Sequence, residues 1–384
     1  MERRRVLLVQ PSLQPPGGGN GVAAWMLQAL TREHHVTVLS WRQVDVDPIN
    51  RFFGTTLRRS DFDTIQLPRT WRAIPELLPV PASLIRSALL MRYTRRFHDR
   101  FDVVVGGHNE TDYGRRGIQY IHYPTYLRPR PAVDFRWYHR FGPALDRYYR
   151  FADRLADFSF ERMQANLTLA NSNWTAAHVE RFLGIQARTL YPPVAPAAAP
   201  LPWSDRADGF LAVGRISPEK DYQRLIAILA RVRVHRPAVT LTIVGTTDRH
   251  GRRYYDQLRA AAVAAGSWVT FRHDVTREEL RSMLASHRYG IHGMREEHFG
   301  MAPAEMARAG MIVWVPNGGG QVEIVASPDL TFDSDEEAAD SIGRVMASAG
   351  EQGRLREHLA SRVQLFSAES FVSTVQSIVR DFRE

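Results

Sequence analysis

The order of short apolar runs and amphipathic segments is the feature that most constrains the fold. Apolar runs without polar alternation, such as residues 5–10 (RVLLVQ) and 102–105 (DVVV), are typical of parallel strands buried on both faces. Helical segments separate these runs, and the same alternation starts again at Phe210. The pattern therefore predicts an α/β protein with two Rossmann-like, doubly wound domains that face each other across a cleft. Ligands of such sheets bind at the carboxyl ends of the strands.

A proline- and alanine-rich stretch at residues 191–208, YPPVAPAAAPLPWSDRAD, separates the two halves. It lacks periodicity and is predicted to be a linker. A chain of 384 residues with 44% apolar content is large enough for two hydrophobic cores. The apolar run at the N-terminus is too short for a signal peptide, and no run approaches the roughly 20 apolar residues of a membrane-spanning helix.

The positive charge of the chain comes almost entirely from arginine. The net charge of +9 suggests an acidic partner such as nucleic acid, anionic lipid or nucleotide phosphate. Arginine supplies nearly all of the positive charge, and the only lysine is Lys220. Because an ammonium and a guanidinium are not interchangeable at a tight phosphate site, this single lysine is a functional hint. The absence of cysteine excludes disulfides and thiolate zinc sites.

A glycine-rich loop, PPGGGNG, follows the first predicted strand and precedes a predicted helix at residues 22–30. Glycines at such a turn, here Gly18 and Gly19, allow the backbone to approach a phosphate or a packed neighbour. The loop does not have the G-x-G-x-x-G pattern of dinucleotide-binding proteins, and a plain tight turn is the alternative.

Residues 74–101 are the candidate for a membrane contact. An apolar loop (IPELLPVP) is followed by a predicted helix with Ile85, Leu89 and Tyr93 on one face and arginines on the remainder. A basic amphipathic helix can lie on anionic lipid. A helix packed on the sheet is favoured, and the two interpretations are compatible.

Three D-x-D patterns, at residues 45–47, 61–63 and 333–335, have the form of a metal-binding motif. None lies beside a second acidic or histidine cluster in the sequence. We interpret them as solvated loop carboxylates and predict no metal.

Residues 289–325 are the richest in candidate binding groups. They are predicted to form a strand end, a loop with an acidic pair, a short helix opening at Phe299-Gly300-Met301, a buried strand, and a glycine loop at 317–320 that feeds another helix. Two helix N-termini with unpaired amides would favour anions. Glu297 and Glu305 can accept hydrogen bonds from hydroxyl groups, so the stretch suits a ligand that is part sugar and part phosphate.

The second domain opens with another candidate phosphate site. After the strand at 210–213 the sequence continues as GRISPEKDYQRLI, so Arg215 and Lys220 flank a turn that enters a helix. Cations are disfavoured at a helix N-terminus unless an anion is bound there. Both side chains can therefore converge on the phosphates of one ligand.

Together these motifs resemble a known family. The spacing of Glu297 and Glu305, embedded in EHFGMAPAEMARAG, resembles the E-x7-E motif of retaining glycosyltransferases of family 4, which have the two-domain GT-B architecture. The segment from Gly214 to Lys220 matches the family's G-R-x-x-x-E-K diphosphate loop residue for residue. The resemblance implies an acceptor-side domain at 1–190, a nucleotide-sugar donor domain at 209–366, and a last helix at 367–384 that crosses back to the first domain.

A further segment, YIHYPT at residues 120–125, resembles that of the family's mannosyltransferases of asparagine-linked glycosylation, which extend a lipid-linked oligosaccharide. In family 4 such a histidine typically lies by the donor sugar and diphosphate, and the resemblance gives that role to His122. A structural histidine is the alternative. After Phe271 the family usually has a glycine near the nucleotide base, whereas this chain has Arg272-His273-Asp274. This departure leaves the base open.

The resemblance implies a metal-independent hexosyltransferase that retains the anomeric configuration. Glu297 would bind hydroxyls of the donor sugar and Glu305 those of the ribose, while cations and amides stabilise the departing diphosphate. Catalytic roles are expected for His122, Arg215, Lys220 and Glu297. Donor-binding roles are expected for Gly18, Gly19, Arg215, Lys220, Arg272, Glu297, Phe299, Gly300, Met301 and Glu305.

No cofactor is expected, because the nucleotide-sugar donor is a substrate. GDP-mannose is favoured, and a UDP-sugar is the alternative. The expected acceptor is a glycan or a lipid-linked glycan. We expect a cytoplasmic protein with an optional peripheral contact to the anionic inner face of the membrane, and no nucleic-acid partner.

Three rival functions remain open. A glycosidase could use both glutamates, but if both lay on one helix they would be about 12 Å apart along its axis, which exceeds the roughly 5 to 9.5 Å that such pairs need. A nucleotide-sugar binding protein without turnover is the second. The third is a nucleic-acid binder that uses the arginines and aromatic residues interleaved at 128–160. We favour packed helices with extended arginine side chains for that segment.

Overall fold

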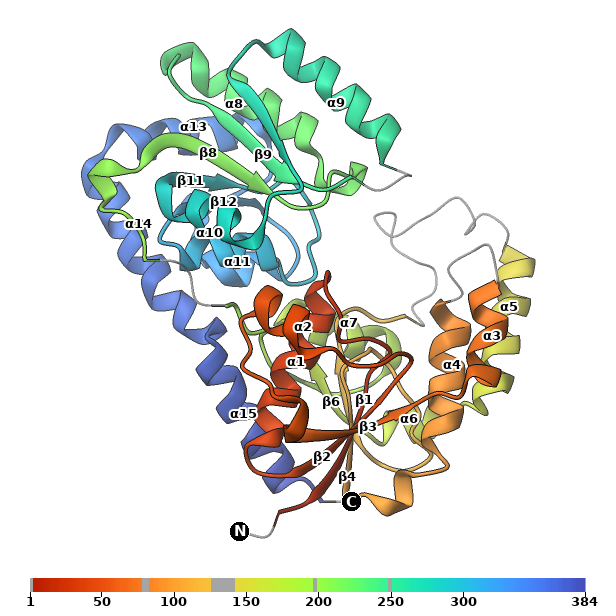
Figure 1. The fold of residues 1–384 in the computed structure, drawn as a ribbon. Helices are drawn as coiled ribbons and strands as arrows, with labels where there is room; N and C mark the ends of the chain where they lie inside the picture. The colour runs from red at the N-terminus through yellow and green to blue at the C-terminus, as the bar shows by residue number, and fades with distance from the viewer. Residues whose placement is uncertain (1–2, 78–82, 126–141, 196–198, 248–250, 384) are drawn as a thin grey trace. The chain divides into compact units, whose positions relative to one another are not determined.

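The computed structural model of the protein describes residues 3–77, 83–125, 142–195, 199–247 and 251–383. Its contacts divide the chain into two compact units: Met1–Pro193 with Ala368–Glu384, and Val194–Ser367. Each unit consists of a parallel sheet with helices around it (Figure 1). The prediction of two doubly wound α/β domains is therefore confirmed.

The first unit has a seven-stranded sheet in the order β3-β2-β1-β4-β5-β6-β7. All neighbouring strands in it are parallel. Chain order reverses between β1 and β4, which creates a switch point at their carboxyl ends. The strands are β1 (Arg5–Val9), β2 (His35–Ser40), β3 (Phe62–Gln66), β4 (Val103–Gly106), β5 (Ile118–Ile121), β6 (Leu167–Ala170) and β7 (Ala187–Thr189).

The helices of the first unit cover both faces of this sheet. Short 3-10 turns at Arg59–Asp61 and His98–Arg100 precede β3 and β4. The helices are α1 (Gly18–Thr31), α2 (Val46–Phe53), α3 (Arg69–Leu77), α4 (Ser83–Thr94), α5 (Gly142–Ala156), α6 (Phe160–Gln164), α7 (Asn173–Leu183) and α15 (Ala368–Asp381).

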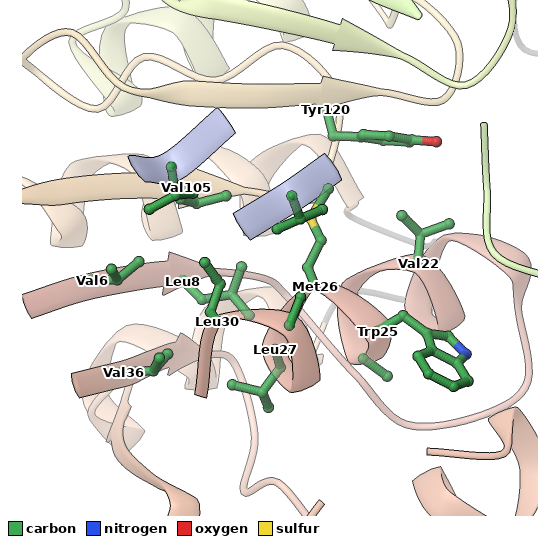
Figure 2. Packing of buried hydrophobic residues seen from close by; sticks show 14 of the residues in the cluster. Val6, Leu8, Val22, Trp25, Met26, Leu27, Leu30, Val36, Val105 and Tyr120 are labelled. Atoms are coloured by element: carbon green, nitrogen blue, oxygen red, sulfur yellow. The ribbon is translucent and has the colours of Figure 1, made fainter. Parts of the chain in front are cut away.

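Strand β1 shows why its sequence is apolar at successive positions. Val6 and Leu8 point into the core beneath α1, whereas Leu7 and Val9 point into a second core on the other face. Figure 2 shows the first of these cores, in which Met26 and Leu30 of α1 lie over β1. Because both faces are covered, the strand has no solvent side on which polar residues could alternate.

Helix α15 follows the second unit in sequence but belongs to the first unit. Its residues Phe371, Val375 and Val379 are buried in the same core as α1. Arg4 extends this attachment, because its guanidinium donates hydrogen bonds to the carbonyls of Val379 and Phe382 at 2.8 and 3.0 Å. The last helix is thus fixed by packing and by hydrogen bonds to the start of the chain.

The second unit has a six-stranded sheet in the order β10-β9-β8-β11-β12-β13, again with parallel neighbours. Chain order reverses between β8 and β11. The strands are β8 (Ala207–Val213), β9 (Leu241–Gly245), β10 (Val269–His273), β11 (His287–Ile291), β12 (Ile312–Pro316) and β13 (Thr331–Phe332).

The helices of the second unit alternate with its strands, and only helices and 3-10 turns follow β13. Short 3-10 turns occur at Trp203–Asp205, Pro218–Lys220, Pro328–Leu330 and Val363–Phe366. The helices are α8 (Tyr222–His235), α9 (Arg252–Ala265), α10 (Arg277–Ser286), α11 (Met301–Arg308), α12 (Gln321–Val325), α13 (Asp335–Ala347) and α14 (Ala349–Arg362).

Several predicted boundaries were wrong. Helix α1 begins at Gly18, not at residue 22, so Gly18 and Gly19 form its first turn. Strand β8 and the 3-10 turn before it occupy part of the predicted linker. Residues 74–101 are not a loop and one long helix, because α3 continues to Leu77 and α4 ends at Thr94. Residues 126–141, part of the arginine- and aromatic-rich segment, lie outside the described residues.

Helix α4 packs on the sheet, as favoured for residues 74–101. Leu90 and Tyr93 are buried against β1 and its neighbours, and Ala88 and Met91 pack against α5. Within the described residues, no helix combines the length and the apolar character required to cross a membrane. Contact of this basic surface with lipid stays a prediction.

Candidate functional site

The switch point of the second sheet brings together two loops that are far apart in sequence. The chain leaves β8 through Gly214 and Arg215 and enters the 3-10 turn Pro218–Lys220. It leaves the adjacent strand β11 directly into His292. Because β8 and β11 are parallel neighbours, both loops lie at the carboxyl edge of the sheet, where α/β proteins bind ligands.

Lys220 and Glu297 meet at this edge, although 77 positions separate them in the chain. The Lys220 ammonium donates to Oε2 of Glu297 in an ion pair, with the two side chains 14% and 17% exposed. Nε2 of His292 lies 3.1 Å from the same oxygen, and the His292 side chain is 4% exposed. The sequence predicted that Lys220 and Glu297 share one site, and the structure places them in direct contact.

The electrostatics of this cluster keep Glu297 ionised. Burial alone would raise the pKa of the Glu297 carboxyl, but the Lys220 charge and the His292 hydrogen bond outweigh it and hold the pKa well below its usual range. Burial also lowers the pKa of His292. The imidazole is therefore neutral near pH 7 and donates its Nε2–H to the carboxylate.

The glycine loop between β12 and α12 holds the backbone of Glu297. Gly319 has φ of +75°, and a Cβ there would lie 2.2 Å from the Glu297 carbonyl oxygen. The Gly320 amide donates to that same oxygen at 2.7 Å. These glycines thus serve close backbone packing. The Gly320 amide at the N-terminus of α12 is used internally and α12 has only five residues, so anion binding at this end stays a prediction.

Helix α11 begins at Met301, two residues later than predicted, with Gly300 as its N-cap at φ of +106°. No side chain in the described part of the chain caps this end. No described side chain therefore occupies the N–H groups of Met301 and Ala302 as a cap, and anion binding at this end stays a prediction. Phe299 contributes only its backbone to this edge, because its ring is 3% exposed and packs edge-on against Phe366 at 5.5 Å.

Glu305 lies within α11 and forms an ion pair with Arg277, the first residue of α10. Arg215 is 64% exposed and approaches Glu219 at 3.4 Å. Among the described residues Arg215 forms no ion pair with either Glu297 or Glu305. Arg272 lies in strand β10 with an exposed side chain and, within the described ranges, contacts neither Glu297 nor Glu305.

In the first unit, too, a predicted site residue lies at the carboxyl ends of the strands, beside a helix N-terminus. Nε2 of His122, which follows β5, lies 3.0 Å from the Gly107 carbonyl oxygen, beyond the end of β4. The same ring borders the first turn of α1, since a Cβ on Gly19 would be 3.1 Å from His122 Nε2. No side chain of the described residues caps α1. His122, Gly18 and Gly19 therefore surround an uncapped helix N-terminus, which has the partial positive charge that binds anions.

The residues that support Glu297 and Glu305 were not predicted from the sequence. His292, Arg277 and Gln321 were not singled out, yet the first two hold Glu297 and Glu305. The Gln321 amide is fully buried and donates to the Met294 carbonyl at 2.6 Å, which fixes the loop before Glu297. The signal for His292 was available, because a polar residue directly after a buried strand lies at the edge that binds ligands.

The three D-x-D patterns have structural partners. Asp45 accepts a hydrogen bond from the Asp47 amide and caps α2, and Asp61 accepts one from the Arg58 amide at 2.8 Å. Asp335 forms an ion pair with Arg224 at 2.6 Å. In the described ranges, no group of three acidic or histidine side chains is placed to hold a metal ion.

Residues 199–364 match the family model described as glycosyl transferases group 1. They form a group 1 glycosyltransferase domain. This domain contains Lys220, His292, Glu297 and Glu305, so the predicted donor-side residues of the second unit lie inside the matched region.

Curated proteins that resemble this chain include the GDP-Man:Man(3)GlcNAc(2)-PP-Dol alpha-1,2-mannosyltransferases of Homo sapiens and Dictyostelium discoideum. The human protein is 26% identical over 237 residues, which are 56% of this chain and 48% of that protein. The Dictyostelium protein is 26% identical over 229 residues, 54% of this chain and 45% of that protein. The chain thus spans about half the length of the curated relatives it matches.

Solved structures extend the fold comparison to the whole chain. HepE of Anabaena, in complex with UDP and glucose, has a TM-score of 0.69 at 15% identity and covers 99% of this chain and 100% of that chain. WaaG, a glycosyltransferase involved in lipopolysaccharide biosynthesis, has a TM-score of 0.66 at 17% identity, covering 98% and 100%. The two parallel-sheet units match these structures, so the fold is GT-B.

Proposed function

We propose that the protein is a retaining hexosyltransferase that moves mannose from GDP-mannose to a glycan or a lipid-linked glycan. The observation that carries the proposal is the Lys220, His292 and Glu297 cluster at the switch point of the second sheet. A cation and a carboxylate side by side at that edge suit a ligand with both phosphates and hydroxyls. The chemistry requires both, since the donor is a sugar joined to a nucleoside diphosphate.

Transfer breaks the bond between the anomeric carbon and a diphosphate oxygen, and charge develops on the departing nucleoside diphosphate. In the proposal Lys220, Arg215 and the first amides of α11 stabilise that charge, and preorganised donors of this kind usually make the largest contribution to catalysis. Glu297 would then accept hydrogen bonds from the sugar hydroxyls and Glu305 from the ribose. His122 and the N-terminus of α1 would bind phosphate in the first unit.

The choice of GDP-mannose rests on the curated relatives, whose names specify that donor. A UDP-hexose is the alternative, because the Anabaena structure holds UDP and glucose at much lower sequence identity. The local sequence at β10 leaves the choice of base open, since Arg272-His273-Asp274 stands where the family usually has a glycine near the base. A carboxylate at the end of that strand can accept hydrogen bonds from the N–H groups of guanine, which uracil presents in smaller number.

The acceptor and the membrane contact belong to the same proposal. The relatives act on a lipid-linked glycan by name, and α4 and α5 carry exposed arginines, among them Arg92, Arg147 and Arg150. A surface of this charge favours anionic lipid headgroups. Cosedimentation with vesicles of phosphatidylglycerol and of phosphatidylcholine, at low and high salt, measures that contact directly.

Donor turnover tests the proposal. Purified protein is incubated with GDP-mannose, GDP-glucose, UDP-glucose and UDP-N-acetylglucosamine, and release of the nucleoside diphosphate is followed with and without glycan acceptors. GDP release above the rate of Glu297→Ala supports the proposal. Thermal stabilisation by a donor without any release in the presence of acceptors would instead favour a nucleotide-sugar binding protein.

A further inference from the structure

The Glu297 carboxylate is held in an asymmetric way. In the described part of the chain both hydrogen bonds to it reach Oε2, one from the Lys220 ammonium and one from His292 Nε2. None reaches Oε1. One oxygen is therefore occupied by the protein, while the other keeps both lone pairs for a ligand.

The two donors differ in what they can do when a ligand arrives. Lys220 ends a flexible side chain at the end of the 3-10 turn after β8, and in the proposed function its ammonium moves to the donor diphosphate. The His292 side chain cannot make such a move, because it is 4% exposed directly after β11. Its backbone amide donates to the Trp314 carbonyl of β12 at 2.9 Å, which ties it to the sheet.

The backbone on both sides of His292 and Glu297 is closely packed. A Cβ on Gly293, next to His292, would be 2.4 Å from the Lys220 carbonyl oxygen. The Glu297 carbonyl is held by Gly320, as described above. The donor and the acceptor of the His292 to Glu297 hydrogen bond are thus fixed by their own main chains. A rigid arrangement of this kind maintains one orientation of a binding group.

We infer that His292 is a positioning residue, which orients the Glu297 carboxylate through Nε2–H and keeps it ionised once Lys220 has turned to the diphosphate. The inference rests on the proposed function, because Glu297 is the group that would contact the donor sugar. His292 itself contacts neither the sugar nor the phosphates in this account. Its effect on turnover passes entirely through Glu297.

Among the residues that the structure describes, three charged or titratable groups face Glu297. Lys220 and His292 contact it, and the Tyr222 phenol of α8 interacts with it electrostatically. Burial raises the pKa of Tyr222 well above its usual range, so the phenol is neutral throughout the accessible pH range. Below neutral pH, only Glu297 and His292 can therefore change charge within this cluster.

The test compares His292→Ala with His292→Gln, whose side-chain amide restores an N–H donor. The matched control is His287→Ala, which removes the histidine at the other end of β11, where its Nδ1 bonds to the Met283 carbonyl at 2.8 Å. Selective 13C labelling of Glu carboxyl carbons reports the titration of Glu297 by NMR without any substrate. Turnover of GDP-mannose against pH is measured in parallel.

We expect the Glu297 pKa to rise in His292→Ala and to return towards the wild-type value in His292→Gln. Turnover at saturating donor should fall roughly 10- to 100-fold in His292→Ala, the effect of one hydrogen bond to a charged group. The acid limb of the turnover-against-pH profile of His292→Ala should move to higher pH. His292→Gln should recover most of the wild-type turnover. His287→Ala should change neither quantity.

Two results would overturn the inference. One is an unchanged Glu297 titration in His292→Ala. The other is an equal loss of rate in His292→Gln and His292→Ala. The NMR titration distinguishes this failure from that of the proposed function, because it needs no turnover. An inactive wild-type protein whose Glu297 still responds to His292→Ala would contradict the transferase and leave the positioning role intact.

Discussion

Lys220 and Glu297 form an ion pair at the carboxyl edge of the second sheet, and each side chain is less than one-fifth exposed. The pair joins the loop after β8 to the loop after β11 across the switch point. Without a ligand, each group neutralises the other. An incoming nucleoside diphosphate sugar offers phosphates to one and hydroxyls to the other, so the pair constitutes a pre-assembled site in the resting protein.

Replacing Lys220 tests the phosphate half of this site. Lys220→Met should lower the transfer rate about 100- to 1,000-fold, because one preorganised cation is lost from the transition state. Lys220→Arg should not restore the rate, since a planar guanidinium does not fit the position of a compact ammonium. Steady-state kinetics and calorimetric titration with GDP measure both effects. Wild-type GDP affinity in Lys220→Met would argue against phosphate binding by this residue.

Arg277 gives a test of the ribose half. Its ion pair with Glu305 fixes a carboxylate that the proposal assigns to the ribose hydroxyls. Arg277→Leu should raise KM for the donor about tenfold, the cost of one misplaced hydrogen bond, and change kcat much less. Arg281→Leu, one turn later on α10, is the control, because Arg281 forms no ion pair among the described residues. Equal effects of the two substitutions would exclude a specific role of the Arg277 to Glu305 pair.

The glycine loop gives a prediction that requires no change to a charged group. A Cβ on Gly319 would collide with the Glu297 carbonyl, and its φ of +75° strains any other residue. Gly319→Ala should therefore displace Glu297 and reduce turnover at least tenfold, while nucleotide binding through Lys220 is partly kept. Gly343→Ala is the control, because a Cβ on this helical glycine of α13 meets nothing within 4 Å. Normal turnover in Gly319→Ala would show that the backbone of Glu297 tolerates displacement.

His34 predicts how stability depends on pH. Its side chain is buried, and neither ring nitrogen has a hydrogen-bond partner among the described residues. Burial lowers its pKa, and the charges of Arg4 and Arg380 lower it further although Glu33 opposes them. In the unfolded chain the His34 imidazole takes up a proton near pH 6.5, whereas in the folded chain it stays neutral to lower pH. The free energy of unfolding is therefore greatest above pH 6.5 and decreases as the pH falls below that value.

His34→Leu should remove the part of the pH dependence of stability that His34 causes. The thermal midpoint of the wild-type protein should drop between pH 7.5 and pH 5.0, and the drop should be smaller in His34→Leu. Differential scanning calorimetry at both pH values measures the difference. Equal drops in the two proteins would assign the acid sensitivity to other groups.

The sequence predicted the fold well because both sheets are parallel. Each strand had to be apolar on two faces, as Val6 and Leu7 of β1 show. Such a continuous apolar run can be recognised in the sequence without knowing which strands lie beside it. Boundaries were less accurate. Gly18 and Gly19 were placed in a loop because glycine is a poor helix former, yet they begin α1, where a side chain on Gly19 would crowd His122.

The candidate site was predicted only in part, for a physical reason. Lys220 and Glu297 belong to motifs with fixed spacing, so sequence alone could single them out. The supports of Glu297 come from the ends of β11 and β12, and only the pairing of these strands brings them to it. His292 and Gly319 therefore have no sequence pattern that links them to Glu297.

The central claim is that the second unit binds and activates a nucleoside diphosphate sugar through Lys220 and Glu297. Release of GDP from GDP-mannose by the purified protein, compared with Lys220→Met and Glu297→Ala, tests it most directly. The account predicts that the wild-type protein releases GDP and that the release rate falls at least 100-fold in each variant. Circular dichroism should show that both variants are folded. Release that persists unchanged in both variants, or wild-type protein that neither binds nor cleaves any GDP- or UDP-sugar, would contradict it.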